Sequence, residues 1–174
     1  VRVYNGTGDM VVTQSAGQQV EVVAIKSSVN SDPESVTFRV VEGEFGVLIC
    51  TIYPDAPGEL PQKCDTEAVT ITQANNDVSV RYEIRIPSEL LADINTINGN
   101  IQGLGLDIPF KGRAVNGNVT VNTSNFAIAE TVNGDVDVSM GNPSHFLTID
   151  EGIELKTVTG QLTVTVPPDS SFDY

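Results

Sequence analysis

Aromatic residues and long apolar runs are scarce in this chain of 174 residues. It has six Phe, four Tyr and no Trp, so its core must consist mostly of Val, Ile and Leu. Val and Ile are β-branched and favour the pleated, half-buried surface of a strand. No segment approaches the roughly 18 apolar residues of a membrane-spanning helix. We therefore expect no direct insertion into a membrane.

Positive charge is also in short supply. Nine Lys and Arg stand against 23 Asp and Glu, and the formal net charge is −14. Nucleic acids and anionic membranes bind proteins through cationic contacts, so we expect no nucleic-acid partner. The acidic balance is typical of a soluble extracytoplasmic surface, and a cation-binding surface is the sharper alternative.

Residues suited to catalysis are few. The chain has one histidine, His145, in the Pro-containing stretch 141–145, where we expect a surface loop. A catalytic triad would have to use that residue, because an enzyme needs titratable groups that converge. Neither 6–8 nor 103–105 has the following helix and lysine of a phosphate-binding loop. We predict a non-enzymatic protein with no catalytic residues and no cofactor.

The two cysteines, Cys50 and Cys64, enclose a loop rich in Pro and Gly. A disulfide easily closes such a loop and would stabilise the fold by roughly 3 kcal/mol on the chain-entropy model, which is disputed. A disulfide requires an oxidising compartment, so we expect a periplasmic, cell-surface or secreted protein. The alternative is a pair of buried free thiols.

Apolar and polar residues alternate along most of the chain, and no stretch of ten residues has the 3.6-residue period of a helix. This pattern predicts an all-β fold. Residues 36–40 and 45–50 are typical of a hairpin over the turn at 42–44. Pro87 should end the long strand at 78–86, because proline cannot donate to a strand ladder.

A short motif, Val-Asn-Gly followed by alternating Val, recurs in the second half of the chain. Its marker glycines are 18, 17 and 26 residues apart, and an asparagine precedes three of them; the residues are Asn98, Gly99, Asn116, Gly117, Asn133, Gly134 and Gly160. Recurrence at a nearly fixed step predicts stacked copies of one unit, each burying its apolar face against its neighbours. In the last copy Thr159 replaces the asparagine.

The Asn-Gly pair predicts a tight turn in each copy. Asn tolerates the left-handed region and Gly has no Cβ, so the pair suits both a two-residue hairpin and the corner of a solenoid. A step of 17–18 residues favours a coil of two or three short strands over consecutive hairpins. We expect the asparagines to stack as a structural amide ladder.

These patterns predict a single all-β domain over residues 1–174. Residues 89–166 would form a short, β-helix-like β-solenoid, continuous with antiparallel strands and the disulfide loop in residues 1–88. A β-sandwich is the alternative. An open solenoid end leaves strand edges unpaired, so we expect that a homodimer could form there.

The motifs also resemble those of a known family. The run Thr131-Val132-Asn133-Gly134-Asp135-Val136, its relatives at 96–101 and 114–121, and the strand that ends at Pro87 are similar to the bacterial putative-adhesin family. The opening residues 3–12 resemble that family's first strand and turn, and Cys50 near Tyr53-Pro54, followed by Cys64, resembles a feature of many members. The resemblance implies an exported, all-β envelope protein with a β-helical part. It implies no catalytic residues.

Asp135 and Asp137 are the candidate ligand residues. They are two apart in a predicted strand, so both carboxylates should leave the same face. Neighbouring repeats place polar residues at the corresponding positions, which are Asn118, Thr120, Gln161 and Thr163. Two carboxylates on one face could bind Ca²⁺ weakly or act as an acid and base on a sugar. A solvated outer face without a ligand is the plainer interpretation.

Together these features predict a non-enzymatic exported module of the cell envelope or surface, either an adhesin or a structural scaffold. Its partner would be a glycan or a surface protein bound at low affinity. Two alternatives remain open. One is a carbohydrate-active lyase or hydrolase on a β-helix, and the other is a structural module stabilised by calcium.

Overall fold

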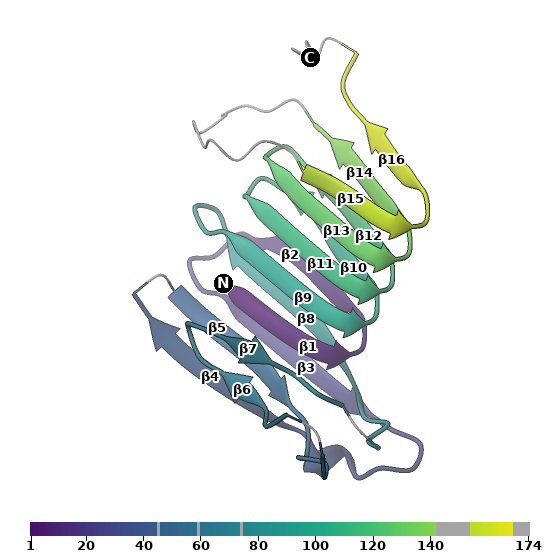
Figure 1. Cartoon of the computed structure of the whole chain (residues 1–174). Helices are drawn as coiled ribbons and strands as arrows, with labels where there is room; N and C mark the ends of the chain where they lie inside the picture. Colours follow the sequence, from purple (N-terminus) through teal and green to yellow (C-terminus); the bar gives the residue numbers. More distant parts are fainter. Residues whose placement is uncertain (45, 59, 74, 142–153, 169–174) are drawn as a thin grey trace.

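The computed structural model describes residues 1–174 apart from 45, 59, 74, 142–153 and 169–174 (Figure 1). The described part is all-β, as predicted, with a three-residue 3₁₀ turn at Pro33–Ser35 and no α-helix. Its strands are β1 (Arg2–Thr7), β2 (Met10–Ser15), β3 (Glu21–Ser27), β4 (Thr37–Gly43), β5 (Gly46–Ile52), β6 (Lys63–Cys64), β7 (Val69–Thr70), β8 (Ser79–Pro87), β9 (Ala92–Asn98), β10 (Ile101–Leu106), β11 (Phe110–Asn116), β12 (Val119–Thr123), β13 (Ala127–Asn133), β14 (Val136–Met140), β15 (Glu154–Thr159) and β16 (Leu162–Thr165).

The strands form two seven-stranded mixed sheets and a separate two-stranded hairpin, β6–β7. Sheet A has the order β15-β13-β11-β9-β1-β5-β4, and sheet B has the order β16-β14-β12-β10-β2-β8-β3. From β9 onward the chain alternates between the sheets, so each repeat adds one strand to each (Figure 1). Consecutive strands therefore lie in different layers, and strands two apart in sequence are neighbours.

Successive repeats pair in parallel and in register. In sheet A, Asn98, Asn116 and Asn133 lie side by side on β9, β11 and β13. In sheet B, Val119 and Val136 lie side by side on β12 and β14. Because side chains alternate between the two faces of a strand, equivalent residues of every repeat enter the core or leave it together.

The strands β1 and β2 are a further copy of the repeat. Thr7 pairs with Asn98 of β9, and Met10 pairs with Ile101 of β10, so the sequence Thr7-Gly8-Asp9 forms the turn. The sequence motif begins later because Thr7 stands where the next three copies have Asn98, Asn116 and Asn133. The stack thus has five turns, at Gly8, Gly99, Gly117, Gly134 and Gly160.

The N-terminal half is mixed, which corrects the prediction of antiparallel strands over residues 1–88. β1 pairs in parallel with both β5 and β9, and β2 pairs in parallel with both β8 and β10. The antiparallel pairs of the described chain are β3–β8, β4–β5 and β6–β7. The strands β1 and β2 belong to the repeat stack, so they run parallel to the repeat strands β9 and β10.

Two local predictions are confirmed. The hairpin over residues 36–50 is β4–β5, in which Gly43 pairs with Gly46. Pro87 is the last residue of β8. The surface loop expected at 141–145, including His145, lies outside the described residues except for Gly141.

The main core lies between the two sheets. Its fully buried side chains include Val3, Ile94 and Phe110 of sheet A and Val12, Ile84 and Val119 of sheet B. A buried polar group links the layers. The Thr51 hydroxyl donates to Asn5 Oδ1 at 2.9 Å and lies 2.8 Å from the Tyr82 hydroxyl. Asn5 Nδ2 donates to the Val80 carbonyl at 2.8 Å, so these contacts hold β1, β5 and β8 together.

Candidate functional site

The five turns stack backbone on backbone along one edge of the molecule. At Gly117, φ is +152°, and a Cβ built there would lie 1.9 Å from the carbonyl oxygen of Gly99. A Cβ built at Gly99, Gly134 or Gly160 would likewise lie 1.9–2.2 Å from the glycine carbonyl oxygen of the preceding turn. No side chain fits at these positions, so glycine is required by the close approach as well as by its φ.

The asparagines before the marker glycines form a row of side-chain hydrogen bonds. Asn116 Nδ2 donates to Asn98 Oδ1 at 2.9 Å, and Asn133 Nδ2 donates to Asn116 Oδ1 at 2.8 Å. Asn98 Nδ2 in turn donates to the Thr7 hydroxyl at 3.4 Å. These side chains are exposed, but their amides bond to one another, which is a structural role.

A second row follows the glycines, and sequence analysis missed it. Asp9 Oδ1 accepts from the Asn100 backbone N–H, and Asn100 Oδ1 accepts from that of Asn118 at 2.9 Å. Asn118 Oδ1 accepts from Asp135, and Asp135 Oδ1 accepts from Gln161, both at 2.8 Å. The signal was present in the sequence, because Asp or Asn follows the marker glycine in four of the five copies.

Asp135 and Asp137 do not share one strand face. β14 begins at Val136, so Asp135 belongs to the turn, where its carboxylate caps the next repeat. Asp137 is exposed on the outer face of β14, in register with Thr120 and Thr163. Within the described residues, no three His, Cys, Asp or Glu side chains gather as they would around a metal ion.

The outer face of sheet B is polar over the repeats. One row runs across the strands through Gln102, Thr120, Asp137 and Thr163. The next outward row contains Asn122, Ser139 and Thr165. These hydroxyl, amide and carboxylate groups could form hydrogen bonds with an extended polar ligand.

The outer face of sheet A has a different character, which sequence analysis did not anticipate. The strand register aligns an aliphatic row on β9, β11, β13 and β15, made of Ile97, Val115, Val132 and Val158. Val115 and Val132 are 41% and 42% exposed, and Val158 is 67% exposed. Each of these residues precedes the Asn or Thr of its turn, so the row could have been found in the repeat motif.

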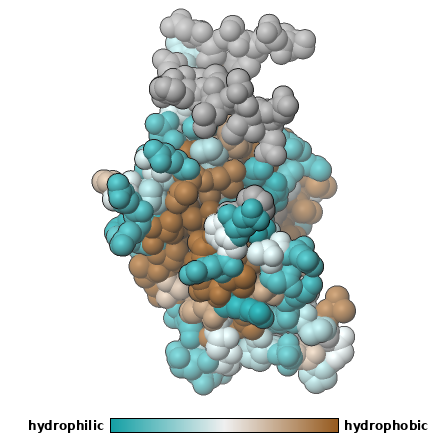
Figure 2. All heavy atoms as spheres, turned by 90° about the vertical axis from the view of Figure 1, so that its left-hand side faces the viewer, coloured by the Kyte–Doolittle hydropathy of each residue, from teal (hydrophilic) through white to brown (hydrophobic). Residues whose placement is uncertain are grey.

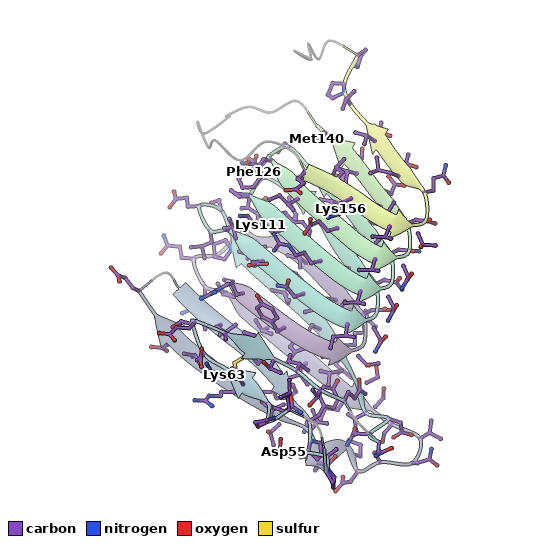
Figure 3. The ribbon with its side chains drawn as sticks, viewed as in Figure 1. Asp55, Lys63, Lys111, Phe126, Met140 and Lys156 are labelled. Carbon is purple, nitrogen blue, oxygen red and sulfur yellow. A yellow bond between two sulfur atoms is a disulfide. The ribbon has the colours of Figure 1, made fainter. Side chains whose placement is uncertain are left out.

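A charged row runs beside the aliphatic row. Arg113 Nε donates to Glu130 Oε2 at 2.7 Å, and Arg113 Nη1 donates to Asp93 Oδ1 at 3.2 Å. Lys156 continues the row on β15, in register with Glu130 (Figure 3). Because these charges are partly exposed, the ion pairs fix side-chain positions more than they stabilise the fold.

A groove of about 400 Å³ lies where this face meets the hairpin β6–β7. Its lining includes Tyr4, Val69, Ile71, Ile97, Arg113 and Val115. Burial raises the pKa of Tyr4, and the nearby Asp93 carboxylate raises it further. Tyr4 therefore stays a neutral phenol there and can donate a hydrogen bond to a ligand.

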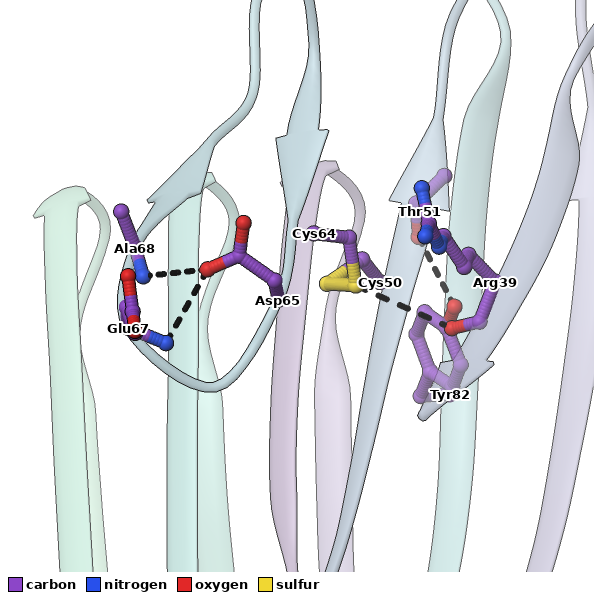
Figure 4. The surroundings of a disulfide bond; sticks show 8 residues. All are labelled: Arg39, Cys50, Thr51, Cys64, Asp65, Glu67, Ala68 and Tyr82. Atoms are coloured by element: carbon purple, nitrogen blue, oxygen red, sulfur yellow. Dashed lines mark hydrogen bonds between the residues drawn. A yellow bond between two sulfur atoms is a disulfide. The ribbon is translucent and has the colours of Figure 1, made fainter. Parts of the chain in front are cut away.

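The Cys50–Cys64 disulfide is confirmed, and it joins the hairpin β6–β7 to strand β5 (Figure 4). Cys50 lies on β5 and Cys64 on β6, with their Cα atoms 6.1 Å apart. Both sulfurs are buried with Leu48 in a small second core over sheet A. Asp65 Oδ1 closes the hairpin by accepting from the backbone N–H of Ala68 at 2.7 Å, which lowers its pKa.

The edge opposite the turns lies on the left of Figure 1. Figure 2 views this side of the molecule and shows hydrophobic residues gathered in a band between hydrophilic borders. A hollow of about 880 Å³ lies on this side, with Val1, Val41, Val47, Leu90 and Lys111 in its lining. The described part of the chain contains no helix that could span a membrane.

Comparison with known proteins identifies a related fold. No protein-family model and no curated protein matches the chain. Among solved structures, it is similar to one described as a putative cell adhesion protein from Clostridium sporogenes, with a TM-score of 0.51 at 10% identity. The match covers 95% of this chain and 92% of that one. A likeness at this identity shows a shared fold.

Proposed function

We propose that the chain is a non-enzymatic adhesion module of an extracytoplasmic surface, and that its repeats form a short solenoid of the bacterial putative-adhesin type. Two observations support this proposal. The solved structure of similar fold is described as a putative cell adhesion protein. The Cys50–Cys64 disulfide is typical of an oxidising compartment such as a periplasm or a cell surface.

The outer face of sheet A carries the proposal. Its aliphatic row places Ile97, Val115 and Val132 on neighbouring strands, beside the row that holds Arg113. Strands in a sheet lie about 4.8 Å apart, so the two rows form a surface suited to an extended ligand laid across them. The groove beside β7 adds the concavity that a binding site needs.

An extended glycan, or an extended segment of a surface protein, fits this surface. Apolar faces of the ligand would pack on the aliphatic row, and Tyr4, Asn95 and Arg113 would supply hydrogen bonds from the groove. The contacts are few, so each site would bind weakly. Adhesion tolerates weak sites because many copies on one surface bind together.

A binding screen tests the proposal. The chain would be applied to a glycan array and to a panel of purified surface proteins, each with and without millimolar calcium. Val115→Glu puts a charge in the aliphatic row and should abolish binding, whereas Asn122→Ala on sheet B should leave it intact. Equal melting temperatures would show that both variants are folded. A blank in every condition would reject adhesion and favour a purely structural part.

The calcium arm tests the alternative site on sheet B. Suppose that binding or the melting temperature rises with calcium and falls with EDTA, and that Asp137→Asn removes this dependence. The polar face of sheet B would then be the functional surface, and the protein would be a calcium-stabilised module. Binding that does not depend on calcium and is lost in Val115→Glu would support the site on sheet A.

A further inference from the structure

The two ends of the repeat stack are finished differently (Figure 1). At the N-terminal end, sheet A ends with β4 and sheet B ends with β3, and both pair antiparallel with their neighbours. At the C-terminal end the last strands are β15 and β16, which continue the parallel repeat. We call the surface formed by β15 and β16 the open end.

The N-terminal end is protected by a charge on its inner face. Lys26 of β3 pairs with Val80, a fully buried core residue, so its side chain starts on the inner side of the sheet. Its ammonium lies 5.5 Å from the centre of the Phe38 ring and 3.4 Å from Glu34. An inward-pointing charge on an edge strand opposes the addition of another strand.

The open end leaves core positions uncovered. Leu162 and Val164 of β16 are in register with Val136 and Val138 of β14. Val136 and Val138 have no exposed surface, whereas Leu162 and Val164 are each 43% exposed. The apolar layer between the sheets therefore continues to the last strands without a cap from the described residues.

Hydrogen bonding stops at the same place. Each turn donates to the next one: the Gly134 N–H donates to the Thr159 carbonyl at 2.8 Å, and the Val136 N–H donates to the Gln161 carbonyl at 2.9 Å. The equivalent donors of the last turn are Gly160 and Leu162, and the described part of the chain offers them no carbonyl. Unpaired edge groups of this kind are a template for another strand.

We propose that the open end binds the open end of a second copy of this chain. A two-fold axis perpendicular to the sheets would pair β15 with β15 and β16 with β16, both antiparallel. Each sheet would then continue into the matching sheet of the second copy. Leu155, Leu162 and Val164 would pack against the same residues of the second copy, which closes the core from both sides.

Charge selects a second copy as the occupant. The chain carries a net charge of −14, yet the charged residues of β15 and β16 are one Glu154 and one Lys156, which cancel. The two edge strands themselves therefore add no net charge repulsion between two copies. A two-fold axis at Leu155 also places Glu154 opposite Lys156 of the second copy, which is a complementary pair.

Sedimentation of the full chain over a wide concentration series tests this dimer. The wild type should show reversible association to a dimer. Val164→Asp, at the open end, should weaken association at least about tenfold, because it buries an unpaired charge in the joint core. The matched control is Val40→Asp, at an inward-facing, 59% exposed position of β4 at the other end, and it should associate like the wild type.

A charge swap on the outer face tests the pairing without disturbing the core. Glu154→Lys should weaken the dimer, and adding Lys156→Glu to it should restore association. A wild type that stays monomeric throughout the series would overturn the proposal. So would a dimer that Val40→Asp dissolves, because that result would mean head-to-tail stacking. Failure of the double variant to regain association would also count against the two-fold arrangement.

Discussion

The repeat half of the molecule and its N-terminal half hold their strands by different means. In the repeats, every turn makes the same contacts with the next: a glycine carbonyl against a glycine, and an amide or carboxylate oxygen against a backbone N–H. Stability there is shared over five similar turns. The comparison teaches that repetition lets exposed polar residues stabilise a stack, because each has a polar neighbour at the equivalent position of the next repeat.

The N-terminal half depends on a few individual side chains instead. The Asn5–Thr51–Tyr82 contacts join the layers, and the disulfide attaches the hairpin β6–β7. Asp77 holds the loop after β3 by accepting hydrogen bonds from the backbone N–H groups of residues 29–31. The bond from Ser31 is the largest of the causes that keep the pKa of Asp77 well below its ordinary value. Removing one of these side chains should therefore destabilise only the strand, hairpin or loop that it holds.

The largest effect is expected at a stacked glycine. Gly117→Ala would place a Cβ 1.9 Å from the Gly99 carbonyl oxygen, so the turn must move apart from its neighbour. We expect a loss of about 3 kcal/mol or more of unfolding free energy, measured by chemical denaturation. The control is Gly105→Ala, where φ is +59° and nothing lies within 4 Å. It should cost about 1 kcal/mol. Equal losses would mean that φ alone explains the glycines.

Removing the disulfide should have the next largest effect. Cys50→Ala combined with Cys64→Ala should cost about 3 kcal/mol on the chain-entropy model, since the residues are 14 apart in sequence. Hydrogen exchange should increase in β6 and β7, while the turn amides of the repeats remain protected. Faster exchange at Gly117 and Gly134 would show that the two halves are not held independently.

The sequence predicted those parts of the structure that depend on local backbone chemistry. Asn-Gly at a regular step marked turns in the second half of the chain, and period-two alternation without a helical period predicted the all-β fold. The hairpin β4–β5 and the end of β8 at Pro87 followed from turn residues and from the missing N–H of proline. Each of these signals lies within a few residues of the feature that it predicts.

The remaining features depend on which strands become neighbours. Thr7 hid the first copy of the repeat, so the parallel direction of β1 and β2 was missed. Asp135 looked like a strand residue because it alternates with Val136, but the turn captures its carboxylate. The aliphatic row on sheet A required the register of four strands. The alternation of apolar and polar residues predicts which side chains share a face of one strand. It does not predict which residues of the neighbouring strands lie beside them.

A smaller effect is expected from the asparagine row. Asn116→Ala removes the bond to Asn98 and the bond from Asn133, and should cost about 1 kcal/mol because both are exposed. Asn122→Ala, an exposed change outside the row, should cost less than about 0.5 kcal/mol. Thermal melting compares the two. Any ligand found in the binding screen should bind Asn116→Ala normally, and unchanged melting with lost binding would assign the row to recognition.

The smallest effect at neutral pH is expected at Tyr82, in the N-terminal half. Tyr82→Phe should cost about 0.5 kcal/mol there, because Thr51 keeps Asn5 as a partner. The pKa of Tyr82 is raised from 10.0 to about 12, chiefly by burial, with the Thr51 hydrogen bond acting in the opposite direction. The folded state thus favours the neutral phenol. The stability that Tyr82 contributes through its raised pKa is complete below pH 10 and is lost as the pH rises through 12.

Phenylalanine cannot ionise, so the stability of Tyr82→Phe should fall less than that of the wild type between pH 10 and pH 12. Denaturation at a series of alkaline pH values measures this difference, and absorbance titration should show a tyrosine that ionises near pH 12 only in the wild type. If the stability of the wild type and that of Tyr82→Phe fell equally with pH, a group other than Tyr82 would cause the alkaline loss of stability. A repeat-half change such as Asn116→Ala should lower stability equally at both pH values, because its hydrogen bonds contain no titrating group.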